Sequence, residues 1–320
     1  MDKPKLALYW AASCGGCEIA VLDIQEKILD VANAFDIVFW PVAMDFKYDD
    51  VRKMEDKSID ICLFNGAIRN SENEEIAHLL RQKSKVLVAF GSCAYEGGIP
   101  GLANLSTKEE MLNFVYKESP STISNNNGLP QTHYKVNEGE IEIPELYEYV
   151  KPLKDVVDVD YYIPGCPPQP EQIWNVIEYI LSGKPLPPAG SVLGAGDKTC
   201  CDECPRERKE KKIKEFHRPY EIIPNPDECL LDQGIICMGP ATRSGCGALC
   251  VKANVPCRGC YGAPPNCLDQ GAKMISALSS VIDAHSPEEI EQILGTITDA
   301  VGTFYRFSLP YSILKRRVVQ

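Results

Sequence analysis

Cysteine is the residue type in this sequence that most clearly indicates chemistry. The chain of 320 residues has fifteen cysteines, and ten of them lie between Cys200 and Cys267. The pairs Cys201/Cys204 and Cys257/Cys260 have the C-x-x-C spacing of metal ligands. Only one of the four histidines, His217, lies in that stretch, so thiolates should dominate. All-thiolate sites suit iron–sulfur clusters or zinc.

Composition and the start of the sequence limit the classes of protein to consider. The first residues carry no secretory signal, which predicts a cytoplasmic chain, and cytosolic cysteines stay reduced rather than forming a disulfide framework. No stretch approaches the roughly 20 apolar residues that span a bilayer. A net charge of -12 argues against a surface for nucleic acid.

Four further cysteines are expected just beyond the ends of predicted strands. They are Cys14, Cys17, Cys93 and Cys166. Parallel sheets bind ligands outside the carboxyl ends of their strands, so these thiols should converge on one site. They suit the tetrahedral ligand set of a 4Fe-4S cluster. Taken alone, Cys14 and Cys17 would fit a thioredoxin-like redox pair equally well. Cys62, inside a strand, is expected to be a small buried hydrophobe.

The elements that must position these thiols alternate between strand and helix patterns. Strands are predicted at 6–10, 36–42, 59–64, 85–90 and 159–163, and helices at 18–35, 72–81 and 171–181. This alternation predicts an α/β fold with a doubly wound parallel sheet. Residues 94–152 read as an irregular insertion without an assigned role. The Pro- and Gly-rich stretch 186–196 predicts a boundary between domains 1–190 and 191–320.

The second predicted domain is rich in loops. The charged run 206–218 reads as a solvated helix face, and residues 225–266 as loops wound around inorganic cores. Helices are expected at 268–284 and 286–300, the second capped by Ser286 with Pro287 at its first position. The aromatic tail, from Phe304 to Tyr311, should pack on this domain or contact a partner. Paired zinc ribbons are the alternative for the cysteines.

Three segments resemble one known family, the small subunit of nickel–iron hydrogenases. They are Cys14-Gly15-Gly16-Cys17-Glu18, Gly91-Ser92-Cys93-Ala94 with Gly97-Gly98-Ile99-Pro100, and Pro164-Gly165-Cys166-Pro167-Pro168. The resemblance implies a flavodoxin-like first domain whose proximal cluster faces the nickel–iron centre of a separate large subunit. It also implies medial and distal clusters in the second domain.

The resemblance assigns three ligand sets, and so three 4Fe-4S clusters. The proximal ligands would be Cys14, Cys17, Cys93 and Cys166; the medial ligands Cys246, Cys250, Cys257 and Cys260; and the distal ligands Cys201, Cys204, Cys229 and Cys237. Cys201 stands where familiar respiratory enzymes have histidine, and Cys250 offers a fourth medial ligand. Cys200 could replace Cys201, and Cys267 could replace Cys250.

The all-cysteine pattern most resembles the cytoplasmic viologen-reducing hydrogenases of methanogens. That resemblance implies electron flow from hydrogen, through an iron–sulfur adaptor subunit, to heterodisulfide reductase. The alternatives are a deazaflavin-reducing hydrogenase, the quinone-reductase subunit of complex I, and a zinc-stabilised interaction protein. No cysteine is expected to act as a nucleophile. Glu18 is expected to be a helix-start carboxylate rather than a proton relay or a partner contact.

Overall fold

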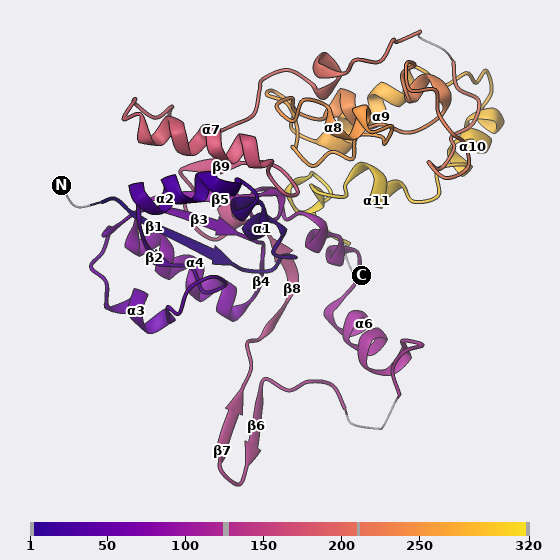
Figure 1. Cartoon of the computed structure of the whole chain (residues 1–320). Coiled ribbons are helices and arrows are strands. Elements are labelled where there is room, and N and C mark those ends of the chain that lie inside the picture. The colour runs from indigo at the N-terminus through magenta and orange to yellow at the C-terminus, as the bar shows by residue number, and fades with distance from the viewer. Residues whose placement is uncertain (1–2, 124–127, 210–211, 318–320) are drawn as a thin grey trace.

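The computed structural model describes residues 3–123, 128–209 and 212–317, and a parallel sheet forms the centre of its first part (Figure 1). Six strands pair in the order β10-β9-β5-β3-β1-β2. Without the short β10, this is the flavodoxin-like order 2-1-3-4-5, so the predicted fold class is confirmed. The strands are β1 (Lys5–Trp10), β2 (Asp36–Phe39), β3 (Ile59–Asn65), β5 (Ser84–Phe90), β9 (Tyr161–Ile163) and β10 (Ser191–Val192).

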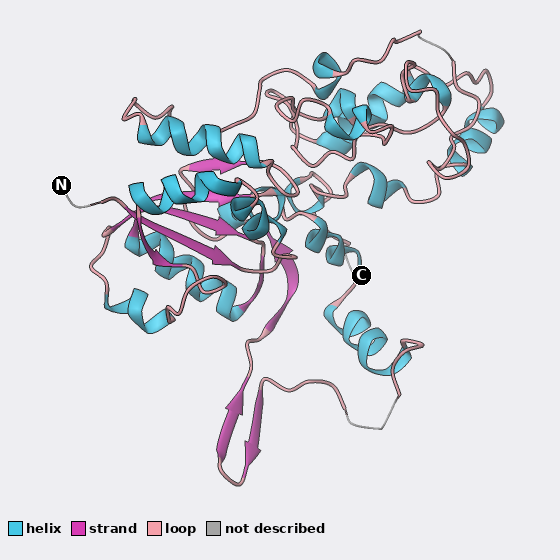
Figure 2. Ribbon diagram, in the orientation of Figure 1, coloured by secondary structure: helices cyan, strands magenta, loops and turns pink. Residues whose placement is uncertain are grey.

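Helices cover both faces of this sheet (Figure 2). Successive residues of β1 alternate between two cores, with Leu6 and Leu8 in one and Ala7 and Tyr9 in the other. Both faces are therefore buried, as in other parallel sheets. On the Leu8 side lie α1 (Gly16–Leu22), α2 (Ile28–Ala34) and α7 (Pro170–Leu181). On the Tyr9 side lie α3 (Tyr48–Lys53) and α4 (Ser71–Lys83).

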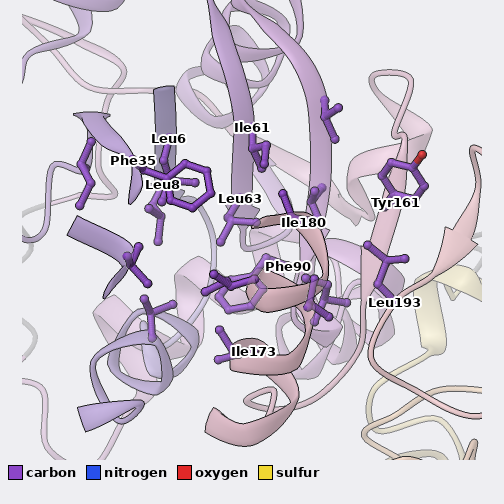
Figure 3. Close-up of a pocket in the computed structure, with 18 of the residues that line it drawn as sticks. Leu6, Leu8, Phe35, Ile61, Leu63, Phe90, Tyr161, Ile173, Ile180 and Leu193 are labelled. Carbon is purple, nitrogen blue, oxygen red and sulfur yellow. The ribbon is translucent and has the colours of Figure 1, made fainter. Parts of the chain in front are cut away.

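The core on the Leu8 side contains a small apolar cavity (Figure 3). Its volume is about 40 Å³, and its walls include Phe35, Phe90 and Ile173. Ligand pockets for organic molecules measure several hundred Å³. The cavity is therefore space left by core packing, and the site chemistry lies elsewhere.

Two predicted elements of the first part end earlier than expected. The single helix predicted over 18–35 is wrong, because α1 ends at Leu22 and a 3-10 turn, η1 (Gln25–Lys27), separates it from α2. Gln25 takes a φ of 61°, a left-handed conformation that no continuous right-handed helix contains. Strand β2 ends at Phe39, two residues before Pro41, whose backbone has no N–H to pair.

The insertion at 94–152 contains regular structure, so the expectation of an irregular segment is wrong. After α5 (Ser92–Glu96) it forms η2 (Ile99–Leu105), α6 (Lys108–Asn113) and the π-helical turn η3 (Phe114–Glu118). A hairpin of β6 (His133–Val136) and β7 (Gly139–Glu142) then projects away from the sheet (Figure 1). The chain returns through β8 (Leu146–Lys151), which pairs with β4 (Ile68–Asn70), and η4 (Leu153–Asp155).

The cysteine-rich part consists mainly of loops and short helices around its own core. Its elements are η5 (Cys200–Glu203), η6 (Leu231–Gln233), η7 (Gly239–Ala241), α8 (Leu249–Lys252), α9 (Gln270–Ser279), α10 (Pro287–Gly295), α11 (Ala300–Phe304) and η8 (Leu309–Tyr311). Ser286 Oγ accepts the backbone N–H of Glu289 at 3.2 Å, so the predicted cap is confirmed. The predicted helix 286–300 is shorter than expected, because α10 ends at Gly295, and α11 is a separate helix that begins at Ala300. The helix predicted over 268–284 is also shorter, because α9 ends at Ser279.

The charged run 206–218 does not form the solvated helix that its composition predicted. Its described residues, 206–209 and 212–218, are bends, bridges and extended segments. Arg206 is only 8% exposed, because its guanidinium points inward to backbone carbonyls. The charged residues of this run are therefore not one face of a helix. One of them, Arg206, is buried and has a structural role, and several others are solvated.

The tail after α11 returns to the first part of the chain. The Phe307 carbonyl accepts the N–H of Gly98 at 3.0 Å, and the N–H of Arg317 donates to the Asn104 carbonyl at 2.8 Å. A Cβ at Gly97 or Gly101 would collide with the ring of Pro310, so small residues are needed there. The tail thus ties the cysteine-rich part to the segment that follows Cys93. Among the described residues, no helix is long and apolar enough to cross a membrane.

Candidate metal centre

The first two cysteines are positioned by the turn between β1 and α1. Gly15 takes a φ of 77°, and a Cβ there would lie 2.9 Å from the Trp10 ring, so only glycine fits this turn. The turn leaves Cys14 exposed and places Cys17 in the buried first turn of α1. The N–H of Gly16 points at Cys14 Sγ, with a nitrogen–sulfur distance of 3.4 Å.

Cys93 lies at the start of α5, immediately after β5. Gly91 precedes it with a φ of 84°, and a Cβ at Gly91 would collide with Cys17 Sγ. A Cβ at Gly98 would lie 2.5 Å from Cys93 Sγ. Both sulfurs therefore pack directly against glycine backbone, which leaves room for a bulky inorganic group beside them.

Cys166 follows β9 in the next loop along the sheet edge. The N–H of Gly91 donates to the Ile163 carbonyl, and the N–H of Ser92 donates to the Gly165 carbonyl, each at 2.8 Å. These two bonds join the loop after β5 to the loop after β9. The carboxyl ends of β1, β5 and β9 therefore bring the four predicted thiols to one edge of the sheet.

The four thiols interact electrostatically in every pair. Burial raises the pKa of Cys17 far above its usual range, and Cys93, Cys166 and Cys14 raise it further. The pKa of Cys93 rises to about 12, first because of burial and then because of Cys166 and Cys14, and that of Cys166 rises through burial and Cys14. A thioredoxin-like site uses two thiols, whereas this sheet edge brings together four. Four convergent thiols beside glycines fit a metal cluster, whose positive charge would stabilise the thiolates.

A second thiol set lies at the outer end of the cysteine-rich part. Cys201 interacts with Cys229 and Cys204, and its pKa rises to about 12 chiefly through burial. Cys237 also interacts with Cys201. A Cβ at Gly239 would lie 2.9 Å from Cys201 Sγ and 3.7 Å from Cys237 Sγ, so glycine backbone again borders the sulfurs.

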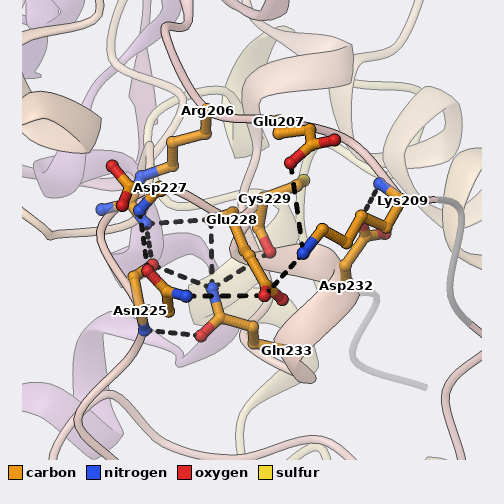
Figure 4. A network of polar contacts seen from close by, with 9 residues as sticks. All are labelled: Arg206, Glu207, Lys209, Asn225, Asp227, Glu228, Cys229, Asp232 and Gln233. Carbon is orange, nitrogen blue, oxygen red and sulfur yellow. Dashed lines mark hydrogen bonds and ion pairs between the residues drawn. The ribbon is translucent and has the colours of Figure 1, made fainter.

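A polar network holds the loop that carries Cys229 (Figure 4). Arg206 Nη1 donates to the carbonyls of Asn225 and Glu228, at 2.7 and 2.9 Å. Gln233 Nε2 donates to the carbonyls of Glu228 and Cys229, at 3.0 and 3.3 Å. The sequence did not indicate these supporting roles, because nothing in the charged run 206–218 distinguishes Arg206, the arginine that points inward, from the other charged residues.

The third thiol set joins Cys246, Cys250, Cys257 and Cys260. Cys250 interacts with Cys257 and Cys246, and Cys260 interacts with the same two. Burial raises the pKa values of Cys250 and Cys260, that of Cys260 beyond its usual range. The structure therefore brings together the thiols that the resemblance assigned to the medial site.

The two spare cysteines occupy different surroundings. Cys200 faces the third set, because its thiol shares hydrogen bonds with Cys246 and Cys257 and lowers the pKa of each. The adjacent Cys201 faces the second set. Cys267 Sγ instead donates to the Asp269 carbonyl at 3.3 Å. Cys62 is fully buried in the core beneath the sheet, as expected.

Direct contacts connect the three sets in a row. The hydroxyl of Ser92, the residue before Cys93, donates to the Cys260 carbonyl. At the other side, the N–H of Cys257 donates to Cys237 Sγ at 3.3 Å. The third set therefore lies between the sheet edge and the outer set.

Two buried carboxyl groups lie close to these sets. Glu18 is in the first turn of α1 but is only 2% exposed, and Trp40 Nε1 donates to its carboxyl. Burial raises the pKa of Glu18, while Trp40 and Asn65 lower it. Glu96, in α5, is also 2% exposed, and burial raises its pKa to about 8. Sequence reasoning missed Glu96, because α5 was not predicted.

Several known proteins are similar to this chain. Residues 14–180 match the family described as NADH ubiquinone oxidoreductase, 20 Kd subunit. The iron–sulfur subunit of the F420-non-reducing hydrogenase of Archaeoglobus profundus is 42% identical over 98% of both chains. A subunit of the F420-non-reducing hydrogenase vhu of Methanocaldococcus jannaschii is 40% identical over 98% of this chain and 97% of that one. A chain of the H2-reduced NAD+-reducing NiFe-hydrogenase is 31% identical over 58% of this chain and 96% of that one, with a TM-score of 0.49.

Fold and thiols together define an iron–sulfur oxidoreductase subunit of the class that includes the 20 Kd subunit of NADH ubiquinone oxidoreductase. Within that class, the chain belongs to the family of iron–sulfur subunits of F420-non-reducing hydrogenases, the small subunits of nickel–iron enzymes. The resemblance of the three motif segments is thereby confirmed, and with it the assignment to a hydrogenase rather than to a zinc-stabilised interaction protein.

Proposed function

We propose that this chain carries electrons from hydrogen oxidation through three 4Fe-4S clusters. Cys14, Cys17, Cys93 and Cys166 would hold the proximal one, and Cys246, Cys250, Cys257 and Cys260 the medial one. The distal ligands would be Cys201, Cys204, Cys229 and Cys237. Clusters at these sites would supply one-electron redox chemistry. The proposed boundary between the two cluster-bearing domains lies near residue 190.

The residues of this chain would bind, orient and insulate the clusters. Glycines 91, 98 and 239 leave space beside sulfurs of the proximal and distal sets. The N–H of Cys257 points at the sulfur of Cys237. Hydrogen bonds to ligand sulfurs and burial are two of the means by which a protein adjusts cluster potentials. No side chain of the three sets needs to act as a nucleophile.

The proposed partners follow from the family. The nickel–iron centre lies on the large subunit, and electrons would enter this chain at the Cys14 set and leave at the Cys201 set. An iron–sulfur adaptor subunit and heterodisulfide reductase would receive them, in the cytoplasm. The sheet edge with Cys14, which is the exposed member of its set, would face the large subunit.

One observation supports the proposal above all others. Hydrogen bonds join the three thiol sets, from Ser92 beside Cys93 to the Cys260 carbonyl, and from the N–H of Cys257 to Cys237 Sγ. Electron transfer between separate sites needs short distances. Two metal sites whose surrounding residues share a hydrogen bond are close enough for electron transfer. A chain whose metals had only a structural role would not need such short distances between them.

Replacement of Cys93 by serine tests the proposal. Hydrogen-dependent reduction of methyl viologen by the two-subunit complex should fall at least about a hundredfold, since the proximal set would lose a thiolate. The Cys62→Ser variant is the matched control, because Cys62 lies in the core away from the three sets. If Cys93→Ser and wild type were equally active, Cys93 would not belong to the electron path.

A further inference from the structure

Three arginines line one hollow of the cysteine-rich part, although the chain as a whole has a net charge of -12. They are Arg218, Arg258 and Arg306. The hollow has a volume of about 70 Å³, and the threonines at 296, 298 and 303 also line it. The arginines come from three separate segments, so the fold, not the local sequence, brings them together.

The three guanidinium groups have few partners of their own. Arg306 Nε donates to the Gly302 carbonyl at 2.9 Å, which leaves its other N–H groups available. Within residues 3–123, 128–209 and 212–317, no acceptor bonds the side chain of Arg218 or Arg258. All three arginines line the same hollow of about 70 Å³, so their positive charges lie within short range of one another.

The acidic groups nearby do not balance these charges. Asp299 lines the hollow, but its Oδ1 caps α11 by accepting the N–H of Gly302 at 2.8 Å. Glu215 lies 3.3 Å from His217 Nε2 and is shared with that ring. Glu221 Oε2 accepts the backbone N–H of Arg218 at 2.7 Å, outside the lining of the hollow. Among the described residues that line the hollow, three guanidinium groups therefore face one carboxylate, that of Asp299. Like charges held together at a half-buried site are unfavourable unless an anion lies between them.

We propose that this hollow is a binding site for a compact oxyanion, a phosphate or a carboxylate group. The planar fork of arginine binds both groups through paired hydrogen bonds. A volume of about 70 Å³ matches a group of a few heavy atoms, roughly that of two or three waters, and is far too small for an organic cofactor.

The position of Arg258 connects the site to electron transfer. This residue lies between Cys257 and Cys260 in the sequence, and the N–H of Cys257 donates to Cys237 Sγ at 3.3 Å. An oxyanion held by Arg258 would add negative charge beside the two outer thiol sets. Its source is either a free ion such as phosphate or a carboxylate of a protein that docks at the outer end of the chain.

Anaerobic equilibrium dialysis of the purified hydrogenase complex distinguishes these sources. The two probes are radiolabelled inorganic phosphate and a labelled hexaglutamate peptide. The variants are Arg218→Gln and Arg306→Gln, with Arg316→Gln as the matched control, since Arg316 lies over the Tyr149 ring in the tail. Iron content, measured for each protein, shows that the clusters are intact.

We expect wild type and the control to retain about one phosphate per chain, and Arg218→Gln and Arg306→Gln to bind it at least about tenfold more weakly. This result supports a free oxyanion as ligand. Retention of the peptide alone, with the same loss, supports a carboxylate from a partner. Equal retention of both probes by wild type, Arg218→Gln and Arg306→Gln, or retention by none of them, would overturn the proposal. Because Arg218 is exposed, its replacement leaves the fold in place.

Discussion

The backbone N–H of Cys257 donates a hydrogen bond to Sγ of Cys237 at 3.3 Å, although these residues belong to two different proposed ligand sets. The proposed medial and distal sites therefore share a wall. A hydrogen bond to a ligand sulfur stabilises the more negative, reduced state of a cluster. With clusters bound, this hydrogen bond would therefore also contribute to the potential of the proposed distal cluster.

The identity of the fourth medial ligand can be tested by substitution. Cys250 interacts with Cys257 and Cys246, whereas Cys267 bonds the Asp269 carbonyl. We expect Cys250→Ala to lose about one iron per chain, because a three-thiolate set holds a three-iron cluster. Cys267→Ala should retain all its iron. Iron analysis and electron paramagnetic resonance of the two variants check this, and the reverse pattern would exchange their roles.

The neighbouring cysteines 200 and 201 should also behave differently. Cys201 interacts with Cys229 and Cys204, while Cys200 faces Cys246 and Cys257. Cys201→Ala is expected to lose up to about four irons with the distal cluster, and Cys200→Ala to keep them. Loss of the distal signal in Cys200→Ala alone would show that Cys200 is the ligand.

Arg206 should be required for the distal site although it binds no metal. Its guanidinium donates to the carbonyls of Asn225, Glu228 and Val251. Arg206→Ala removes a charged donor from all three carbonyls and leaves those of Asn225 and Glu228 with only Gln233 Nε2, which costs about 1 to 3 kcal/mol. We expect lower thermal stability and selective loss of about four irons.

The exposed Arg208 provides the matched control for that experiment. Arg208→Ala removes the same charge two residues away without disturbing the carbonyls. If both variants retain full iron and the same thermal midpoint, the network around Cys229 has no structural role in the site.

Glu96 predicts a pH dependence of stability. Burial raises its pKa to about 8 from an ordinary value of 4.5, and Ala263, Arg243 and Lys154 only partly oppose this. Between these two pH values the folded chain binds more protons than the unfolded chain, so this group makes stability fall as pH rises from 4.5 to about 8. The loss is on the order of a few kcal/mol.

The Glu96→Gln variant should remove this dependence. Its thermal midpoint, compared with that of wild type, should rise more at pH 8.5 than at pH 5, measured anaerobically on the purified complex. Glu138→Gln, an exposed change on the β6–β7 hairpin, should shift neither. A constant difference between Glu96→Gln and wild type across that range would mean that Glu96 does not titrate there.

The sheet and the positions of its cysteines were predictable because their signals are local. Short apolar runs followed by turns with Gly and Cys specify both the fold and the edge where Cys14, Cys93 and Cys166 meet. The break at Gln25 was not predictable, since the apolar spacing continues through it. Only the backbone shows that the helix stops there.

The roles of Arg206 and Glu96 were hidden for a different reason. Each is a charged residue, which by composition alone belongs at the surface. Each is buried by contacts with distant segments, 225–254 for Arg206 and 262–263 for Glu96. Likewise, the path of η5 decides which thiol set Cys200 faces and which Cys201 faces. The spacing of the cysteines in the sequence does not decide this.

The metal and acid-labile sulfide content of the anaerobically purified complex tests the central claim most directly. Three 4Fe-4S clusters on this chain predict about twelve irons and about twelve sulfides per chain beyond those of the large subunit. About two zinc ions with little iron or sulfide would contradict an electron path through the three thiol sets.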